Sequence, residues 1–390
     1  LDALEVYIAT HDSAGTFSEK CLKAVLDVVA SLAATAPDVR KMLLKSAVLR
    51  SVMTKLHEAD NVGVLCAYMW VVNGLYDQDA HTLKEHQVCE YMRLMRSLVI
   101  YLHLTIAEDS IGGSDESSHK LIACIAANNG DDWNADGFVA SAKQTLGRML
   151  LLASSFVNVC LQPDLYFDDS TFVDALMYLL LIFNDDASTL DLFLTFLCSA
   201  TSRVEDESVV CYLALEKRLV EYCAHLASKT EQQCDTAVKA LVIVANCAAS
   251  SELVVRKILE CARLITLFEQ CACGDKGTAL AEETIWCIAA LCETQQHANY
   301  GLIKSSGIDK LVLSALQHYA KSTEAVIIML LLRAVSNLLK HDACEDGQLR
   351  CTVAKSNIVY VIADLQTHKR EKVYKLAVGI LEDFFAELSQ

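Results

Sequence analysis

The sequence of 390 residues contains little proline, few aromatic residues and no long apolar run. Two prolines leave few compulsory turns, which argues against a sandwich or barrel built from many short strands. No uninterrupted apolar run is longer than that of residues 175–183, which has about half the length that a bilayer-spanning helix needs. No basic and apolar leader opens the chain, so we expect no secretory signal. These features favour a protein of the cytoplasm or the nucleus without a membrane span.

Positive charge is also scarce. The chain has 33 Lys and Arg residues against 50 Asp and Glu residues, which gives a net charge of −17. Binding to nucleic acid irrespective of sequence requires clustered cations on the protein, so we expect no nucleic-acid partner. An acidic surface instead attracts partners that carry basic segments. Hydrophobic residues make up 53% of the chain, which is too many for a disordered protein.

The 17 cysteines mostly lie inside apolar segments, as Cys66, Cys160 and Cys198 do. Small disulfide-rich proteins place their cysteines in loops, whereas a reduced thiol behaves as a small core residue. Cys271 and Cys273 raise the alternative of a zinc site. Their one-residue gap differs from the two-to-four-residue spacing of structural zinc ligands. We therefore favour reduced core thiols and expect no cofactor.

Apolar residues recur every three or four positions along most of the chain, which predicts helices. A stripe that begins at residue 21 ends near Pro37, where the proline ring favours a break. Later apolar segments cover residues 285–292, 308–316, 330–339 and 358–365. We expect a short break at Gly307 and polar turns over residues 293–297 and 341–348.

The same pattern returns at a regular interval. The main helix of each unit closes at an equivalent position, which holds a small or amide residue in every unit but the last: Ser31, Gly74, Ser154, Ser199, Asn246, Ala290, Asn337 and Ile380. Most steps are about 43 to 47 residues, a period typical of stacked helical repeats. We predict an all-α, right-handed α-solenoid of about eight repeats that spans residues 1–390 as one body. The alternative is a compact helical protein in which the spacing is accidental.

Two segments depart from the regular repeat. Residues 108–137 are rich in Gly, Ser and acidic residues and lack periodicity, so they are either a long loop or a hinge between two halves of the solenoid. Residues 373–390 form a last helix with an acidic outer face, as a terminal repeat needs for solubility.

The best unit resembles an armadillo repeat. Its residues 283–291, Glu-Thr-Ile-Trp-Cys-Ile-Ala-Ala-Leu, are similar to the third helix of an importin-alpha-type unit. Residues 299–308, Asn-Tyr-Gly-Leu-Ile-Lys-Ser-Ser-Gly-Ile, resemble the corner that leads into the next unit. The endings at Asn246 and Asn337 match the same helix. The resemblance extends over roughly three quarters of the chain, and degenerate HEAT repeats share its helical-pair logic.

The resemblance implies a concave groove lined by third helices, where a Trp grips a bound Lys or Arg stem and an Asn one turn later holds the peptide backbone. The implied groove residues are Trp70, Asn73, Asn246, Trp286, Arg333 and Asn337. No unit carries both the Trp and the Asn. One turn after Trp286 the residue is Ala290, and one turn before Asn337 it is Arg333. We therefore do not expect a classical receptor for nuclear-localisation signals. The alternative for each residue is a core or corner role.

The predicted function is a non-enzymatic scaffold or adaptor that holds a segment of a partner protein, with basic patches, in this groove. The alternative is a cochaperone or regulatory subunit that clamps a folded domain, as some armadillo proteins do with heat-shock chaperones or small GTPases. The sequence contains no phosphate-binding Gly-Lys-Ser/Thr loop, no Gly-x-Ser-x-Gly elbow and no His-Glu-x-x-His motif. We therefore expect no enzymatic activity.

One local motif resembles the first half of a calcium loop, with oxygen ligands at Asp132, Asn134 and Asp136 followed by Gly137. The twelfth position of this loop is Lys143, where a bidentate Glu completes the calcium shell in true sites. The start of a helix at Asp136 explains the same residues, and we favour that interpretation over a metal site.

Overall fold

The computed structural model describes residues 19–35, 170–184, 186–203, 206–228, 234–274, 279–293, 297–345 and 347–386, together with scattered positions between 38 and 154. The described residues are helices and the turns that join them, without a strand. The chain divides into two compact units, Leu1–Ala200 and Thr201–Gln390. The predicted irregular segment 108–137 lies outside the described residues, as do the predicted residues Trp70, Asn73, Asp132, Asn134 and Asp136.

Unit 1 contains three described helices, α2 (Glu19–Thr35), α9 (Ser170–Ile182) and α10 (Ala187–Thr201), the last of which ends at the first residue of unit 2. Helix α2 buries Val25, Leu26, Val29 and Ala33, which are spaced by three or four residues as predicted. The described part of this helix ends at Thr35, and the predicted break at residues 36–37 lies outside the described residues.

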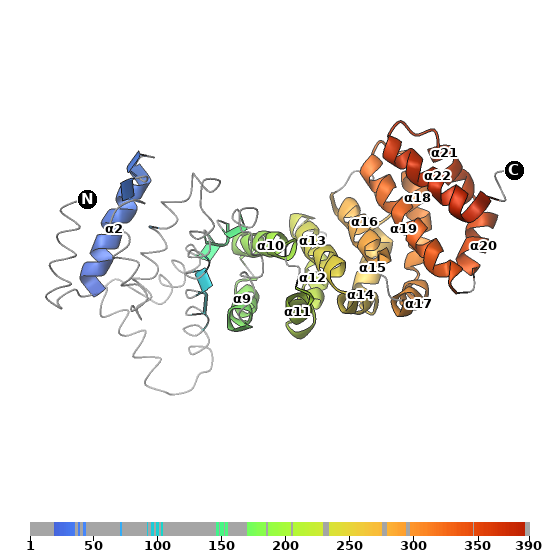
Figure 1. Cartoon of the computed structure of the whole chain (residues 1–390). Coiled ribbons are helices and arrows are strands. Elements are labelled where there is room, and N and C mark those ends of the chain that lie inside the picture. The colour runs from blue at the N-terminus through green and yellow to red at the C-terminus, as the bar shows by residue number, and fades with distance from the viewer. Residues whose placement is uncertain are drawn as a thin grey trace. The chain divides into compact units, whose positions relative to one another are not determined.

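Unit 2 consists of four successive three-helix repeats (Figure 1). Repeat I contains α11 (Glu207–Cys211), a π-helical segment η3 (Tyr212–Glu216), α12 (Leu219–Ala227) and α13 (Cys234–Ser250). Repeat II contains α14 (Glu252–Leu259), α15 (Ala262–Cys271) and α16 (Ala279–Cys292). Repeat III contains α17 (His297–Ser306), α18 (Ile308–Tyr319) and α19 (Ala325–Ala343). Repeat IV contains α20 (Gln348–Lys355), α21 (Ile358–Leu365) and α22 (Glu371–Phe385).

The third helices α13, α16, α19 and α22 form a continuous stack, which we call the third-helix ladder. Each of the first three packs against the third helix of the next repeat, and all four pack against the second helix of their own repeat. They begin at Cys234, Ala279, Ala325 and Glu371, so successive third helices are 45 or 46 residues apart. A three-helix unit cannot bury its apolar side alone, and this stacking gives each repeat its core. The predicted all-helical solenoid of stacked repeats is confirmed in unit 2.

The ends of several helices agree with the sequence prediction. Helix α21 covers Ile358–Leu365, and α17 ends at Ser306 just before Gly307. Gly307 has a φ of +79°, a left-handed conformation that favours glycine and separates α17 from α18. The helical prediction is too short for α19. A polar turn was expected from His341, but the helix continues to Ala343.

Burial of Asp342 explains the longer helix. The side chain of Asp342 is fully buried inside repeat III. Its carboxylate accepts hydrogen bonds from the Tyr300 hydroxyl (3.2 Å) and from the backbone N–H of Arg350 (2.8 Å). A buried carboxylate needs such partners, and Tyr300 and Arg350 lie on either side of the helix end in the sequence. The polar residue therefore belongs to the packed helix and not to a solvated turn.

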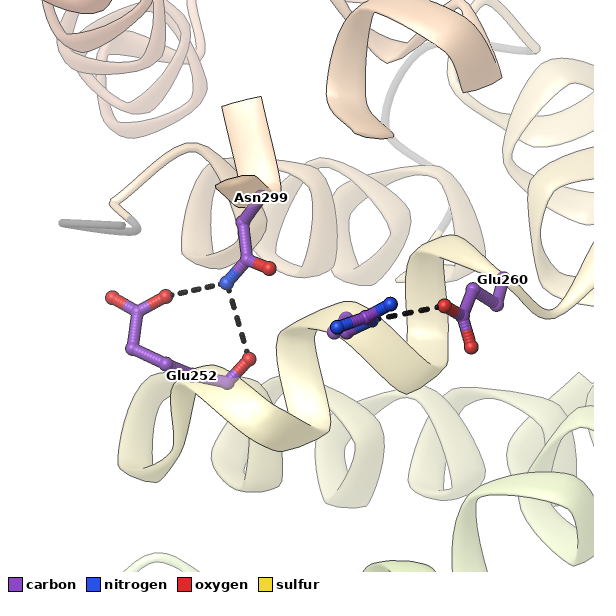
Figure 2. Close-up of polar contacts among 4 residues, drawn as sticks. Glu252, Glu260 and Asn299 are labelled. Carbon is purple, nitrogen blue, oxygen red and sulfur yellow. Dashed lines mark hydrogen bonds and ion pairs between the residues drawn. The ribbon is translucent and has the colours of Figure 1, made fainter. Parts of the chain in front are cut away.

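Successive first helices are joined by partly buried polar contacts. The amide Nδ2 of Asn299 on α17 donates to the Glu252 carboxylate (2.7 Å) and to the Glu252 backbone carbonyl (3.1 Å) at the start of α14 (Figure 2). One repeat earlier, the Ser251 hydroxyl donates to the Glu207 carboxylate at 3.0 Å. Glu207 and Glu252 are each the first residue of their first helix. The same helix position thus accepts a hydrogen bond from the following repeat twice.

Replacement of Asn299 with Ala should lower the free energy of unfolding by about 1–2 kcal/mol, because the partly buried contact with Glu252 loses its amide donor. Asn299→Asp should cost more, about 3 kcal/mol, because it sets two carboxylates together in a buried place. Urea unfolding followed by circular dichroism measures both changes. Asn357→Ala is the matched control, since Asn357 is exposed and makes no side-chain cap contact. Equal effects of Asn299→Ala and Asn357→Ala would contradict the proposed role of the contact.

Candidate functional site

The predicted partner-binding residues that the structure describes all lie on the third-helix ladder. Asn246 lies on α13, Trp286 on α16, and Arg333 and Asn337 on α19. Trp286 and Arg333 are exposed, and the two Asn residues are half-buried. They stand on three successive third helices, at the register positions that the repeat pattern assigned to them.

The burial pattern shows that this side of the ladder is open. On α16, Ile285 and Cys287 are buried, whereas Trp286 between them is 44% exposed. On α19, Leu332 and Ala334 are buried, whereas Arg333 between them is exposed. Residues four positions apart share one face of a helix, so Asn337 lies on the same stripe as Arg333. Trp286 is therefore not a core residue, so the alternative of a core role does not apply to this position.

Two carboxylates lie one turn before Trp286 on the same helix. Glu282 and Glu283 are both half-buried and lie four and three residues before Trp286, respectively. Burial raises the pKa of Glu283, and the nearby Glu282 carboxylate raises it further. A cation placed beside these carboxylates would offset both causes, since an opposite charge favours the ionised form. Sequence reasoning assigned no role to this pair, although the i−4 and i−3 spacing to Trp286 was a visible signal.

The next third helix carries the opposite charge. Arg333 is exposed and forms no ion pair with any residue in the described part of the chain. The side-chain amide of Asn337 likewise makes no hydrogen bond within that part. The open face thus presents an aromatic ring with two carboxylates on α16, and a guanidinium with an amide on α19.

The amide of Asn246 is already engaged. Its Nδ2 donates to the hydroxyl of Thr201 at 3.1 Å. This contact links α13 to the first residue of unit 2 and holds the Asn side chain against the protein. Asn246 therefore has less capacity for a ligand than Asn337, and its place in a binding groove stays a prediction.

No protein-family model and no curated protein sequence matches the chain. Among solved structures, an engineered protein of the Northeast Structural Genomics Consortium is 15% identical, with a TM-score of 0.50 over 63% of this chain and 92% of that one. A designed armadillo repeat protein in complex with the peptide (KR)4 is 17% identical, with a TM-score of 0.48 over 62% of this chain and 94% of that one. At these identities a likeness concerns the fold alone.

The number of helices per repeat separates the two related repeat classes. Unit 2 has three helices in each repeat of about 45 residues, the armadillo pattern, whereas HEAT repeats of similar length have two. The chain has an armadillo-type repeat fold. The third helices of unit 2 stack in chain order, and this stack leaves Trp286 and Arg333 exposed.

The described cysteines of the armadillo-type repeats form no disulfide and differ in burial. Cys223, Cys247, Cys287 and Cys292 are buried, as the prediction of core thiols requires, whereas Cys273, Cys344 and Cys351 are exposed. The Cys287 thiol donates to the backbone carbonyl of Leu241 on α13 at 3.1 Å. Burial raises the pKa values of Cys287 and Cys292, which keeps both thiols protonated. No group of three or more His, Cys, Asp or Glu residues in the described part is arranged to hold a metal ion. None of the helices described there is long and apolar enough to span a bilayer.

Replacement of Glu283 with Gln should stabilise the protein at neutral pH and not at acid pH. A pKa that is higher in the folded state means that folding favours the protonated carboxyl, so the ionised form costs stability above that pKa. The amide removes this cost, and we expect a gain of about 0.5 kcal/mol at pH 7. The gain should disappear as the pH falls below the raised pKa. At about pH 4 the wild-type carboxyl is mostly protonated, so the substitution changes little.

Urea unfolding at pH 7 and pH 4 tests this expectation. Glu269→Gln is the matched control, because Glu269 is an exposed carboxylate on the second helix of the same repeat. A gain of equal size at both pH values would mean that ionisation of Glu283 is not its cause.

Proposed function

We propose that this chain is a non-enzymatic scaffold that holds a segment of a partner protein along the open face of the third-helix ladder. The observation that carries the proposal is the exposure of Trp286 with two carboxylates one turn away. Tryptophan is a favoured anchor at protein interfaces because it buries a large apolar area and keeps a polar N–H.

The chemistry around Trp286 suits a basic residue of the partner. A Lys or Arg stem can lie on the indole, where its cation gains a cation–π contact of roughly 0.5–2 kcal/mol. The carboxylates of Glu282 and Glu283 supply the counter-charge. The net charge of −17 adds long-range attraction for a basic segment and speeds its association.

The residues on α19 suit the backbone of the same segment. The Asn337 amide offers both a donor and an acceptor, which an extended peptide backbone can satisfy. The Arg333 guanidinium offers donors for a carbonyl or a carboxylate of the partner. The segment that fits best therefore carries a basic residue for α16 and an acceptor for α19. Uniform positive charge along the segment would set a cation against Arg333.

A peptide array read against the purified protein tests the proposal. We expect enrichment of short segments that combine a Lys or Arg with a nearby acidic or polar residue. Trp286→Ala should weaken the best peptide at least about tenfold, and Arg333→Ala should weaken it by a smaller factor. Fluorescence anisotropy with a labelled peptide measures both changes. Tyr360→Ala is the control, because Tyr360 is 70% exposed on α21, a second helix.

Glu283→Gln separates binding from folding. This variant should bind the basic peptide more weakly although its fold is more stable at neutral pH. Unchanged affinity in Trp286→Ala with an intact fold would overturn the assigned face. The absence of any enriched motif on the array would overturn segment binding and favour a folded partner domain, such as a chaperone or a small GTPase.

A further inference from the structure

A second candidate site lies away from the open face of the ladder, where the turns of repeats III and IV meet. A cavity of about 510 Å³ is formed there by the end of α18 with the turn that follows it, and by the end of α21 with residues 367–370. Helices α18 and α21 pack against each other and bring these two turns together. Ligand pockets in proteins typically measure about 300–1,000 Å³, so this cavity has room for a small organic molecule.

The lining of the cavity is basic in a protein that is strongly acidic. Lys321, Lys369 and Arg370 line it, against one carboxylate from Asp364. Some cations elsewhere in unit 2 have acidic partners, as in the Lys257–Glu221 contact of 3.1 Å and the Lys375–Glu371 contact of 2.7 Å. Within the part of the chain that the structure describes, the three lining cations form no ion pair. A chain with more acidic than basic residues thus leaves three neighbouring cations facing one cavity.

The acidic residues next to the cavity do not offset this charge. Glu371 follows Arg370 directly, but its carboxylate is held by Lys375. Glu324 precedes α19 and is not among the residues that line the cavity. The lining therefore carries an excess of positive charge that an anionic group can neutralise.

Further polar groups in the lining suit a phosphate oxygen. The His368 Nδ1 accepts a hydrogen bond from the backbone N–H of Arg370 at 3.1 Å. A neutral His368 must then carry its proton on Nε2, which makes that atom a donor. Ser322, Thr323 and Thr367 also line the cavity. The Thr367 hydroxyl already donates to the backbone carbonyl of Asp364 at 2.8 Å, whereas the Ser322 hydroxyl accepts from the backbone N–H of Glu324 and keeps its own proton. Cations, an imidazole N–H and hydroxyls are the groups that bind phosphate in proteins.

The remaining wall is apolar. Val361 and Leu365 of α21, together with Ala320 and Ala325, contribute side chains without polar atoms. An inorganic ion would leave this wall in contact with water, whereas an organic group attached to the phosphate would cover it. We propose that the cavity binds a small organic phosphate, with the phosphate against Lys321, Lys369 and Arg370 and the organic body on Val361 and Leu365.

Phenyl phosphate is a suitable probe because it joins a phosphate to a small apolar ring. Ligand-observed NMR titrations of the whole chain at low salt should show binding of phenyl phosphate. Inorganic phosphate should bind about tenfold more weakly, because it leaves the apolar wall uncovered. Phenol, which lacks the phosphate, should not bind measurably. A rise in salt from about 50 to 300 mM should weaken phenyl phosphate binding, because exposed cations are screened.

Variants locate the site. Lys369→Ala with Arg370→Ala should weaken phenyl phosphate at least about tenfold, and Lys321→Ala, in the other repeat, should weaken it independently. The matched control removes two exposed cations outside the lining, with Lys310→Ala and Lys355→Ala, and should leave the affinity unchanged. Thermal unfolding by circular dichroism checks that each variant is folded.

Three results would overturn the proposal. They are no binding of phenyl phosphate to the wild type, affinity no higher than that of inorganic phosphate, and unchanged affinity in both cavity variants. A peptide bound at Trp286 provides an independent readout, because the cavity residues are not part of the third-helix face. If the cavity variants lose phenyl phosphate binding but still bind the peptide, the result supports the cavity site independently of the scaffold function.

Discussion

Contact between neighbouring third helices is the constraint on which the rest of unit 2 depends. Helices α13, α16 and α19 each have a third helix of the next repeat beside them and a second helix of their own repeat against them. Most of each helix surface is therefore committed to burial, as the fully buried Ile285, Ile288 and Leu291 of α16 show. A narrow stripe stays outside. Because the repeats stack at nearly constant spacing, this stripe presents an equivalent exposed position on each third helix. The fold therefore sets where these positions lie, and the sequence sets which side chain occupies each of them.

The polar contacts between repeats explain how apolar stacking keeps a fixed register. Burial of Leu, Ile and Val side chains is not directional, and small shifts along the ladder would cost little area. The contacts of Asn299 with Glu252 and of Asp342 with Tyr300 and Arg350 are directional. Each contact holds a polar side chain against specific partners, and a shift would break these hydrogen bonds at a cost of about 1–3 kcal/mol.

The sequence predicts much of this architecture because local signals and repeat signals agree. The apolar stripe of residues 358–365 matches α21, and the break at Gly307 follows from the need for a left-handed residue there. The extension of α19 to Ala343 was not predictable from local pattern. His341 and Asp342 are polar and look like a turn, and only the packing of Tyr300 against the helix end reveals that Asp342 is buried. Tertiary contacts override local preference at that point.

The candidate sites differ in how far the sequence can predict them. Trp286, Arg333 and Asn337 follow from the repeat register, because each lies at a fixed place within its own unit. The Glu282 and Glu283 pair is visible only after Trp286 is known to be exposed, since the same pattern in a core helix would have no ligand to meet. The basic cavity is even harder to predict from the sequence. Lys321 and Arg370 are separated by an entire repeat, and only the contact of α18 with α21 sets them on one cavity.

Charge is therefore segregated within unit 2 in a way that net composition conceals. Two carboxylates lie one turn before the exposed indole on α16, whereas the turns between second and third helices in repeats III and IV carry three cations that form no ion pair with a described residue. Screening limits the reach of exposed charges to about 8–10 Å at physiological salt, so each group acts on its own surroundings. A protein with a net charge of −17 can accordingly attract a basic segment at one place and an anion at another. The stacked fold makes this separation possible, because the exposed stripe of a third helix and the turn between the second and third helices are different surfaces of a repeat.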